Sequence, residues 1–176
     1  MLKGSIVALI TPFDNGDLSE DGYIKLINYH LQNGTNGVVP GGTTGESPTL
    51  SHNEHKKIIE IAVKECKGKI PVVAGTGSNS TDEAIELSKF AEKAGSDALL
   101  VVTPYYNKPT QEGLYQHYKK INDHVGIPIL IYNIRKQHGA YHVVSICCNL
   151  FKWFTRNIED TKSRIVYASS LRYIYT

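Results

Sequence analysis

Cysteine is scarce in this chain, and the cysteines that are present do not form a recognisable set. There are three in 176 residues, Cys66, Cys147 and Cys148, and no two have Cys-x-x-Cys spacing. No histidines accompany them at the intervals typical of zinc ligands. We therefore expect reduced thiols, as in the cytoplasm, and neither a disulfide framework nor a metal site.

Long apolar runs and an excess of charge of one sign are also missing. The apolar run at residues 6–10 is too short for the core of a signal peptide, and no stretch reaches membrane-spanning length. The 19 basic and 17 acidic residues are scattered and leave a net charge of +2. That balance gives no electrostatic footprint for nucleic acid or an anionic membrane. We expect a cytoplasmic protein with neither as a partner.

Glycine and proline are absent from the last part of the chain. Of fifteen glycines none follows Gly139, and of seven prolines none follows Pro128. The same part holds two of the three cysteines and the only tryptophan. Because turn residues mark the joints between helices and strands, their loss predicts two regions. Residues 1–134 have regularly spaced turn residues and form a partial barrel, and residues 135–176 form a tail without a recognisable barrel pattern.

Up to about residue 133, short apolar runs alternate with segments of helical spacing. The runs are rich in valine and isoleucine and predict five strands buried on both faces, at residues 5–10, 37–39, 71–74, 98–102 and 127–131. Four helices are predicted between them, with capping residues Ser51, Ser80 and Thr110 at three of the starts. This order implies parallel strands joined by right-handed crossovers.

Polar side chains follow several of these strands, which favours a closed barrel over an open doubly wound sheet. An open sheet gathers its ligand groups at one switch point, whereas here Thr43, Thr103 and Tyr132 each follow a different strand. Neither the dinucleotide-binding Gly-x-Gly-x-x-Gly pattern nor a P-loop is present. A complete (β/α)8 barrel needs about 250 residues. We therefore expect an α/β fold, an incomplete barrel of about five βα units plus an aberrant tail.

Hydroxyl and phenol groups are the candidate site residues. Thr43 and Thr44 lie in a glycine-rich turn, Tyr106 lies in a Pro-Tyr-Tyr-Asn stretch, and Tyr132 ends the fifth strand. Each has a structural alternative, because threonines satisfy turn backbone and tyrosines serve as core or interface aromatics. For Tyr105 the surface or interface reading is the better one.

The histidines give no catalytic pattern of their own. No base with an orienting partner is visible around His117 or His124. We expect both to be surface or interface groups.

Several motifs together resemble one known family. Residues 42–47 read Gly-Thr-Thr-Gly-Glu-Ser, 73–77 read Val-Ala-Gly-Thr-Gly, 103–107 read Thr-Pro-Tyr-Tyr-Asn, and 4–12, 111–117 and 132–133 complete the set. On these motifs, residues 1–134 resemble the dihydrodipicolinate synthase family of pyruvate-dependent class I aldolases. The paired threonines and Pro-Tyr-Tyr-Asn favour the synthases over the related N-acetylneuraminate lyases, which commonly have Ser-Thr in the first motif. A lyase-like aldolase is the alternative.

The resemblance implies a reaction and a set of roles. Family members condense pyruvate with aspartate semialdehyde in lysine and diaminopimelate biosynthesis, through a Schiff base on a lysine and without metal or cofactor. By resemblance, Thr43, Tyr106 and Tyr132 form the proton relay, with Tyr132 exchanging the proton at the substrate. Tyr106 reaches across a subunit interface into the site of a neighbouring subunit in a homo-oligomer, a tetramer in the family. Thr44 holds the pyruvate carboxylate.

The sequence departs from the family pattern after residue 133. The family continues with Pro-x-Arg-Thr-Gly, whose arginine binds the semialdehyde carboxylate, whereas residues 135–139 read Arg-Lys-Gln-His-Gly. Gln137 stands at the arginine position. Arg135 or Lys136 is a candidate replacement.

The Schiff-base lysine is the second departure. The family carries it in a sixth apolar strand, and no such strand is recognisable here. Lys162 lies at about the expected separation, but residues 159–161, Glu-Asp-Thr, give it an acidic context that keeps an amine protonated. Lys162 is therefore a weak candidate. We expect a chain that is truncated or frameshifted after residue 134 and inactive as a synthase.

A non-catalytic role is the main alternative to an enzyme. Five parallel strands without closure leave two open sheet edges, and open edges pair with other chains. The alternative is an interaction module that associates with another copy or with a relative. Either way we expect a homo-oligomer or an aggregation-prone chain.

Overall fold

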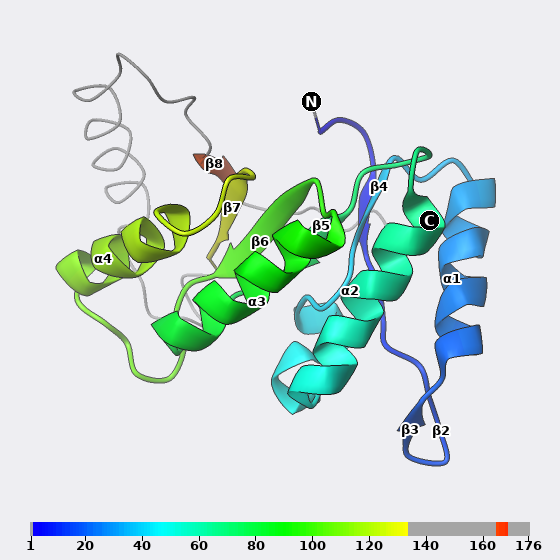
Figure 1. The fold of residues 1–176 in the computed structure, drawn as a ribbon, viewed down its shortest axis with the longest axis horizontal. Helices are drawn as coiled ribbons and strands as arrows, with labels where there is room; N and C mark the ends of the chain where they lie inside the picture. The colour runs from blue at the N-terminus through cyan, green and yellow to red at the C-terminus, as the bar shows by residue number, and fades with distance from the viewer. Residues whose placement is uncertain (1, 134–164, 169–176) are drawn as a thin grey trace.

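The computed structural model of the chain describes residues 2–133 and 165–168 (Figure 1). Strands and helices alternate along these residues, as the sequence predicts. The five expected strands are β1 (Ile6–Ala8), β4 (Gly37–Val39), β5 (Val73–Gly75), β6 (Ala98–Val102) and β7 (Ile129–Tyr132). The four expected helices are α1 (Glu20–Gln32), α2 (His52–Cys66), α3 (Thr81–Ala94) and α4 (Gln111–Asn122).

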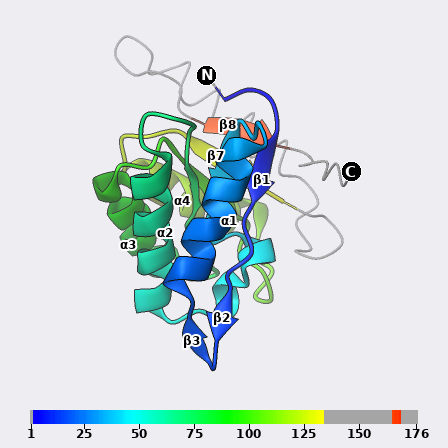
Figure 2. The same cartoon turned by 90° about the vertical axis from the view of Figure 1, so that its right-hand side faces the viewer.

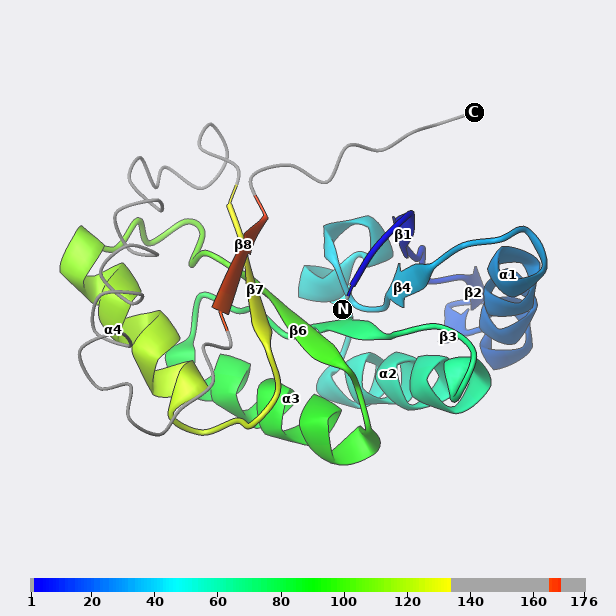
Figure 3. The same ribbon diagram turned by 90° about the horizontal axis from the view of Figure 1, so that it is seen from above.

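The strands form one parallel arc. β1 pairs with β4, an isolated parallel bridge joins Val38 to Val72 ahead of β5, and β5, β6 and β7 follow side by side. The four helices lie on one face of this arc, as the view from above shows (Figure 3). That arrangement places all helices outside and leaves the opposite face as the inside of a barrel wall.

The tail contributes one strand that the sequence pattern does not reveal. β8 (Ile165–Ala168) pairs in parallel with β7, with Ile129 opposite Ile165 and Tyr132 opposite Ala168. The expectation that no strand follows β7 is therefore wrong. Only four residues long and without a flanking glycine or proline, β8 gave no signal of the kind that marks the other strands. The proposed boundary at residue 134 stays a prediction.

The predicted helix starts are confirmed with one difference. At α2, Ser51 and Glu54 form the complete capping box, with Glu54 N–H donating to Ser51 Oγ and Ser51 N–H donating to the Glu54 carboxylate at 2.7 Å. At α3, Ser80 Oγ accepts from Glu83 N–H, but the Glu83 carboxylate accepts from Ser78 instead. The start of α3 is thus capped without the reciprocal bond.

A short hairpin before α1 is absent from the sequence-based description. β2 (Phe13–Asp14) and β3 (Asp17–Leu18) pair antiparallel around Asn15 and Gly16, whose φ angles are 52° and 95°. Asn-Gly is the usual pair for a two-residue turn with positive φ, so the signal was present. The hairpin projects beyond the end of α1 (Figure 2).

Two apolar layers pack against the two faces of the sheet. Between sheet and helices, the outward side chains of β6 and β7 are completely buried: Leu99, Val101, Ile129 and Ile131. On the inner face, the alternate residues Leu100, Leu130 and Tyr132 join a smaller cluster with Val39 and Val73. This alternation is that of a barrel wall with a helix-covered outside and an apolar inside.

Among the described residues, no helix is long and apolar enough to cross a membrane. The same part of the chain has no cluster of three or more histidine, cysteine, aspartate or glutamate side chains able to hold a metal ion.

Candidate active site

The candidate residues lie at one edge of the sheet. Thr43 and Thr44 open the 3-10 turn η1 (Thr43–Gly45), which follows the carboxyl end of β4, and Tyr132 ends β7. Because the strands are parallel, their carboxyl ends share one edge, and barrel enzymes assemble their chemistry there. The order of elements alone thus places the two threonines and the tyrosine at the functional end of the arc.

Close backbone packing fixes the glycine-rich turn. Gly41 has a φ of 65°, and a Cβ there would lie 2.5 Å from His55 Nε2. A Cβ on Gly75 would lie 2.3 Å from the Gly41 carbonyl oxygen. Gly75 N–H donates to the Pro40 carbonyl at 2.8 Å. Only glycines permit this approach of the two strand ends, and the approach sets the position of η1.

A side chain from the segment that follows β1 holds the far end of η1. Thr11 Oγ1 donates to the Gly45 carbonyl at 2.7 Å. Within the turn, Gly45 N–H bonds the Gly42 carbonyl and Glu46 N–H bonds the Thr43 carbonyl, both at 3.0 Å. These backbone bonds do not depend on the Thr43 hydroxyl, which weakens the alternative that Thr43 only satisfies the turn.

Tyr132 faces the inside of the arc. It belongs to the inner-face cluster with Leu100 and is half-buried. Its backbone carbonyl accepts from Thr103 N–H at 2.9 Å, and Thr103 Oγ1 donates to Asn133 Oδ1 at 3.1 Å. The ends of β6 and β7 are therefore locked together, so the phenol is presented from a fixed backbone at the mouth of the arc.

Tyr106 and Tyr105 point into different surroundings. Tyr106 is 90% exposed and has a φ of 67°, unusual for a residue with a side chain. Tyr105 is half-buried, and burial followed by the charge of Glu83 raises its pKa. A phenol held outward by a strained backbone fits the expected reach across a subunit interface, and that role of Tyr106 stays a prediction.

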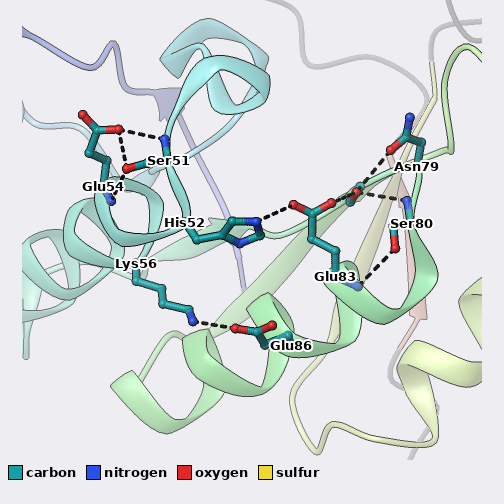
Figure 4. Close-up of polar contacts among 9 residues, drawn as sticks. Ser51, His52, Glu54, Lys56, Asn79, Ser80, Glu83 and Glu86 are labelled. Carbon is teal, nitrogen blue, oxygen red and sulfur yellow. Dashed lines mark hydrogen bonds and ion pairs between the residues drawn. The ribbon is translucent and has the colours of Figure 1, made fainter.

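A polar hollow lies behind the glycine-rich turn, and no sequence motif indicated it. It has a volume of about 230 Å³ and is lined among others by His52, His55, Ser78, Asn79, Glu83 and Tyr105. Figure 4 shows Glu83 extending from α3 with His52 on one side and Asn79 and Ser80 on the other. His52 Nε2 lies 3.4 Å from the Glu83 carboxylate. The residues come from four separate segments, so no local motif announces them.

His55 links this hollow to the glycine-rich turn. Its Nε2 lies 2.7 Å from the Gly75 carbonyl oxygen. Burial lowers the pKa of His55, and the hydrogen bond to Gly75 opposes that shift to a smaller extent. A neutral imidazole with its proton on Nε2 donates to the carbonyl, so His55 acts as a buried strut beneath Gly41 and Gly75.

The expectation that His117 is a surface group is wrong. It is 4% exposed, and its Nδ1 lies 2.9 Å from Thr81 Oγ1 at the start of α3. Burial lowers its pKa to about 4. A histidine on the inner side of α4 follows from its place one residue before the fully buried Tyr118 and three after Leu114. His124 is exposed, as expected.

The candidates in the tail lie outside the described residues. These are Arg135, Lys136, Gln137 and Lys162. The described strand β8 reads Ile-Val-Tyr-Ala and contains no lysine.

The arc and its edge define the class of the molecule: it is part of a (β/α)8 barrel. The pattern of the Dihydrodipicolinate synthetase family matches residues 1–162, and the chain belongs to that family. The match extends past residue 134, where the recognisable motifs stop.

Similar sequences carry one name. The chain is 71% identical to a 4-hydroxy-tetrahydrodipicolinate synthase of Pelagibacter ubique over 162 residues, which cover 92% of this chain and 55% of the relative. It is 59% identical to the synthase of Bradyrhizobium diazoefficiens, covering 91% of this chain and 53% of the relative. The chain thus spans about half the length of the curated relatives it matches.

Solved structures agree with the fold. The chain superposes on a crystal structure of dihydrodipicolinate synthase with a TM-score of 0.84 and 48% identity, covering 88% of this chain and 54% of that one. The enzyme from Aquifex aeolicus gives a TM-score of 0.81 with 48% identity, 91% of this chain and 56% of that one. The fold is therefore an incomplete (β/α)8 barrel.

Proposed function

We propose that this chain carries the proton-relay and carboxylate-binding half of a 4-hydroxy-tetrahydrodipicolinate synthase site. The proposed reaction condenses pyruvate with aspartate semialdehyde in lysine and diaminopimelate biosynthesis. The observation that carries the proposal is the fixed turn at Thr43 and Thr44, at the same sheet edge as Tyr132. One similar structure, from Acinetobacter baumannii, is a dihydrodipicolinate synthase complexed with pyruvate.

The proposed roles follow the chemistry of an imine-forming aldolase. Tyr132 gives and takes the proton at the reacting carbon, and Thr43 connects its phenol to that of Tyr106 from another subunit. Thr44 and the amides of the glycine-rich turn bind the pyruvate carboxylate, since backbone N–H groups directed at one point stabilise negative charge. The exposure of Tyr106 supports its exchange between subunits.

We propose that the chain by itself does not complete the reaction. The reaction requires an unprotonated lysine amine in a dry setting. The sixth parallel strand of the arc, β8, has no lysine, and Lys162 precedes it in an acidic sequence context. Gln137 cannot make the bidentate contact that an arginine makes with a carboxylate. Arg135 or Lys136 would have to replace that contact.

Two alternative functions make different predictions for the binding of pyruvate and of other chains. A non-catalytic remnant that acts through its sheet edges would bind partners and no pyruvate. An N-acetylneuraminate lyase-like aldolase would cleave a sugar acid, and the paired threonines argue against it.

A cytoplasmic location and self-association belong to the proposal as well. One similar structure is described as the first monomeric dihydrodipicolinate synthase variant, which supports association among the others.

Calorimetric titration with pyruvate tests the proposal. We expect millimolar affinity at best, because so few atoms bind weakly without covalent capture. Thr44→Val, which keeps the shape and removes the hydroxyl, should weaken this binding further, while Thr49→Val on the exposed neighbouring turn should not change it. Binding that is equal in both variants would contradict the proposed carboxylate site.

We also propose that the hollow around Glu83 binds free lysine. One similar structure, from Cyanidioschyzon merolae, has lysine bound. A carboxylate beside Ser78, Asn79 and the Tyr105 phenol suits an ammonium group in a small polar hollow. Titration with lysine should give saturable binding that Glu83→Gln reduces and Glu86→Gln, on the exposed side of α3, leaves unchanged. Equal binding in both variants would place lysine elsewhere.

A further inference from the structure

One carbonyl of the glycine-rich turn lacks the local donor that its neighbours have. In a 3-10 turn, each carbonyl accepts a hydrogen bond from the N–H three residues later. The Thr43 carbonyl accepts in this way from Glu46 N–H at 3.0 Å, and the Glu46 carbonyl accepts from Thr49 N–H at 2.9 Å. Three residues after Gly45 stands Pro48, which has no N–H to donate. The Gly45 carbonyl therefore needs a donor from outside the turn.

Thr11, in the segment that follows β1, supplies that donor. Its Oγ1 donates to the Gly45 carbonyl at 2.7 Å. Gly45 is buried, and a buried carbonyl that loses its donor keeps the full cost of its desolvation. The Thr11 hydroxyl thus does for Gly45 what a backbone N–H does for the neighbouring carbonyls.

Close packing fixes the two segments against each other. A Cβ on Gly45 would lie 2.9 Å from the Leu9 carbonyl oxygen and 3.1 Å from Thr11 Oγ1. Leu9 N–H donates to the Val39 carbonyl at 3.0 Å, so the segment that carries Thr11 is itself paired with the end of β4. The start of η1 is held by the close approach of the ends of β4 and β5. Thr44 therefore lies between two anchors, one at each end of the turn.

We infer that Thr11 is a positioning residue for the carboxylate site: its hydroxyl replaces the N–H that Pro48 lacks and thereby holds Thr44 and the turn amides in the geometry that binds a carboxylate. This inference deepens the proposed function and rests on the proposed pyruvate site. Thr11 acts through Gly45 and not by touching pyruvate. Donors that are already in place bind charge better than donors that must be ordered on binding, so loss of the hydroxyl weakens binding.

Amide hydrogen exchange of the full chain, followed by mass spectrometry, tests whether the hydroxyl holds the turn. Thr11→Val removes the hydroxyl and should speed exchange in residues 42–50 about tenfold or more, while α4 keeps its exchange rate. Thr11→Ser should restore the slow exchange. Thr49→Val is the matched control, because the Thr49 hydroxyl donates to the Glu46 carbonyl at 2.9 Å and that carbonyl also has a backbone donor. Exchange should not change in this variant.

Restoring the missing N–H gives a second test. Pro48→Ala supplies an N–H three residues after Gly45, so Thr11→Val combined with Pro48→Ala should exchange more slowly than Thr11→Val alone. Pro48→Ala by itself should have little effect, because the Thr11 hydroxyl is still present. If Thr11→Val loses its helical circular dichroism, Thr11→Ala replaces it in both comparisons. Exchange that is unchanged without the hydroxyl, or that neither Thr11→Ser nor Pro48→Ala slows again, would overturn the inference.

Pyruvate titration separates this inference from the proposed function. Thr11→Val should weaken the binding severalfold, as Thr44→Val does, and Thr11→Ser should bind as the unmodified chain does. Weaker binding in Thr44→Val with unchanged binding in Thr11→Val would overturn the positioning role alone. Binding that neither variant changes would contradict the proposed carboxylate site and the inference with it.

Discussion

The outer and inner faces of the same two strands differ in how completely they are covered. On the outer face of β6 and β7, Leu99 and Ile131 are completely buried beneath α3 and α4. On the inner face, Leu130 and Tyr132 lie one residue away and keep part of their surface exposed. The strand–helix layer is therefore finished by local βα units, whereas the inner layer depends on strands from elsewhere.

This difference separates two kinds of stabilisation in a barrel. Each helix covers its own strand pair through contacts made within a few dozen residues. The inner layer needs opposing strands, so it gains its full stabilisation only when the ring closes. The candidate site depends on both layers, because Thr43 and Thr44 are held by the outer scaffold through His55 while Tyr132 projects inward.

Matched truncations on the two faces should have the largest and most unequal effects. Leu99→Ala removes a fully buried side chain from the outer layer and should lower the free energy of unfolding by about 2 to 5 kcal/mol. Leu130→Ala, on the partly exposed inner face, should cost about 1 kcal/mol or less. Urea unfolding followed by circular dichroism measures both. Equal losses would mean that the inner face is already covered.

The outer layer should also be sensitive to pH through His117. Its pKa in the folded state is about 4 against an ordinary value of 6.5, so the unfolded chain binds the proton more readily between these values. The free energy of unfolding should therefore fall as the pH is lowered from 6.5 to 4, by up to about 3 kcal/mol, and level off below.

Two variants check the assignment. His117→Gln should flatten this pH dependence, and His124→Gln, at an exposed site on the same segment, should leave it unchanged. Some dependence should remain, because burial also lowers the pKa of His55 and His30. An unfolding free energy that rises on acidification would contradict the account.

A smaller effect should distinguish the helix caps within the outer layer. Ser51→Ala breaks the complete capping box of α2 and should cost about 1 kcal/mol. Ser80→Ala should cost less, because the Glu83 carboxylate accepts from Ser78 and gives Ser80 no reciprocal bond, whereas Ser51 N–H donates to Glu54 at 2.7 Å. Thermal unfolding of the two variants measures the difference, and a larger loss at Ser80 would refute it.

Regular features of the outer layer could be predicted from the sequence. The apolar runs identified β1, β4, β5, β6 and β7, and the helical spacing identified α1 to α4. These elements are local, and each is marked by its own capping or turn residues. The hairpin around Asn15 and Gly16 has typical turn residues, but its strands are only two residues long, too short to show an alternating apolar pattern.

Features that depend on several segments could not be predicted. β8 is recognisable as a strand only through its pairing with β7, since its four residues carry no flanking turn signals. The hollow around Glu83 draws on α2, α3 and two loops. The position of His117, three residues after Leu114 on α4, indicated its burial, but its partner Thr81 lies on another helix and could not be predicted.

The candidate site could be predicted from the sequence in part. The motifs placed Thr43, Thr44 and Tyr132 at strand ends, and the parallel arc puts those ends at one edge. What the motifs omit is the support: the Gly41 and Gly75 approach and the His55 strut beneath it. Their roles in proton transfer and carboxylate binding stay predictions.

Trapping of the imine tests the central claim, that this chain holds a half-site without a working Schiff-base lysine. Pyruvate and borohydride are added to the purified chain, and the adduct is located by mass spectrometry. A lysine near its ordinary pKa of about 10.4 is almost wholly protonated at neutral pH, so we predict only low, nonspecific labelling. Stoichiometric labelling at Lys162, lost in Lys162→Arg and weakened in Tyr132→Phe, would contradict the claim.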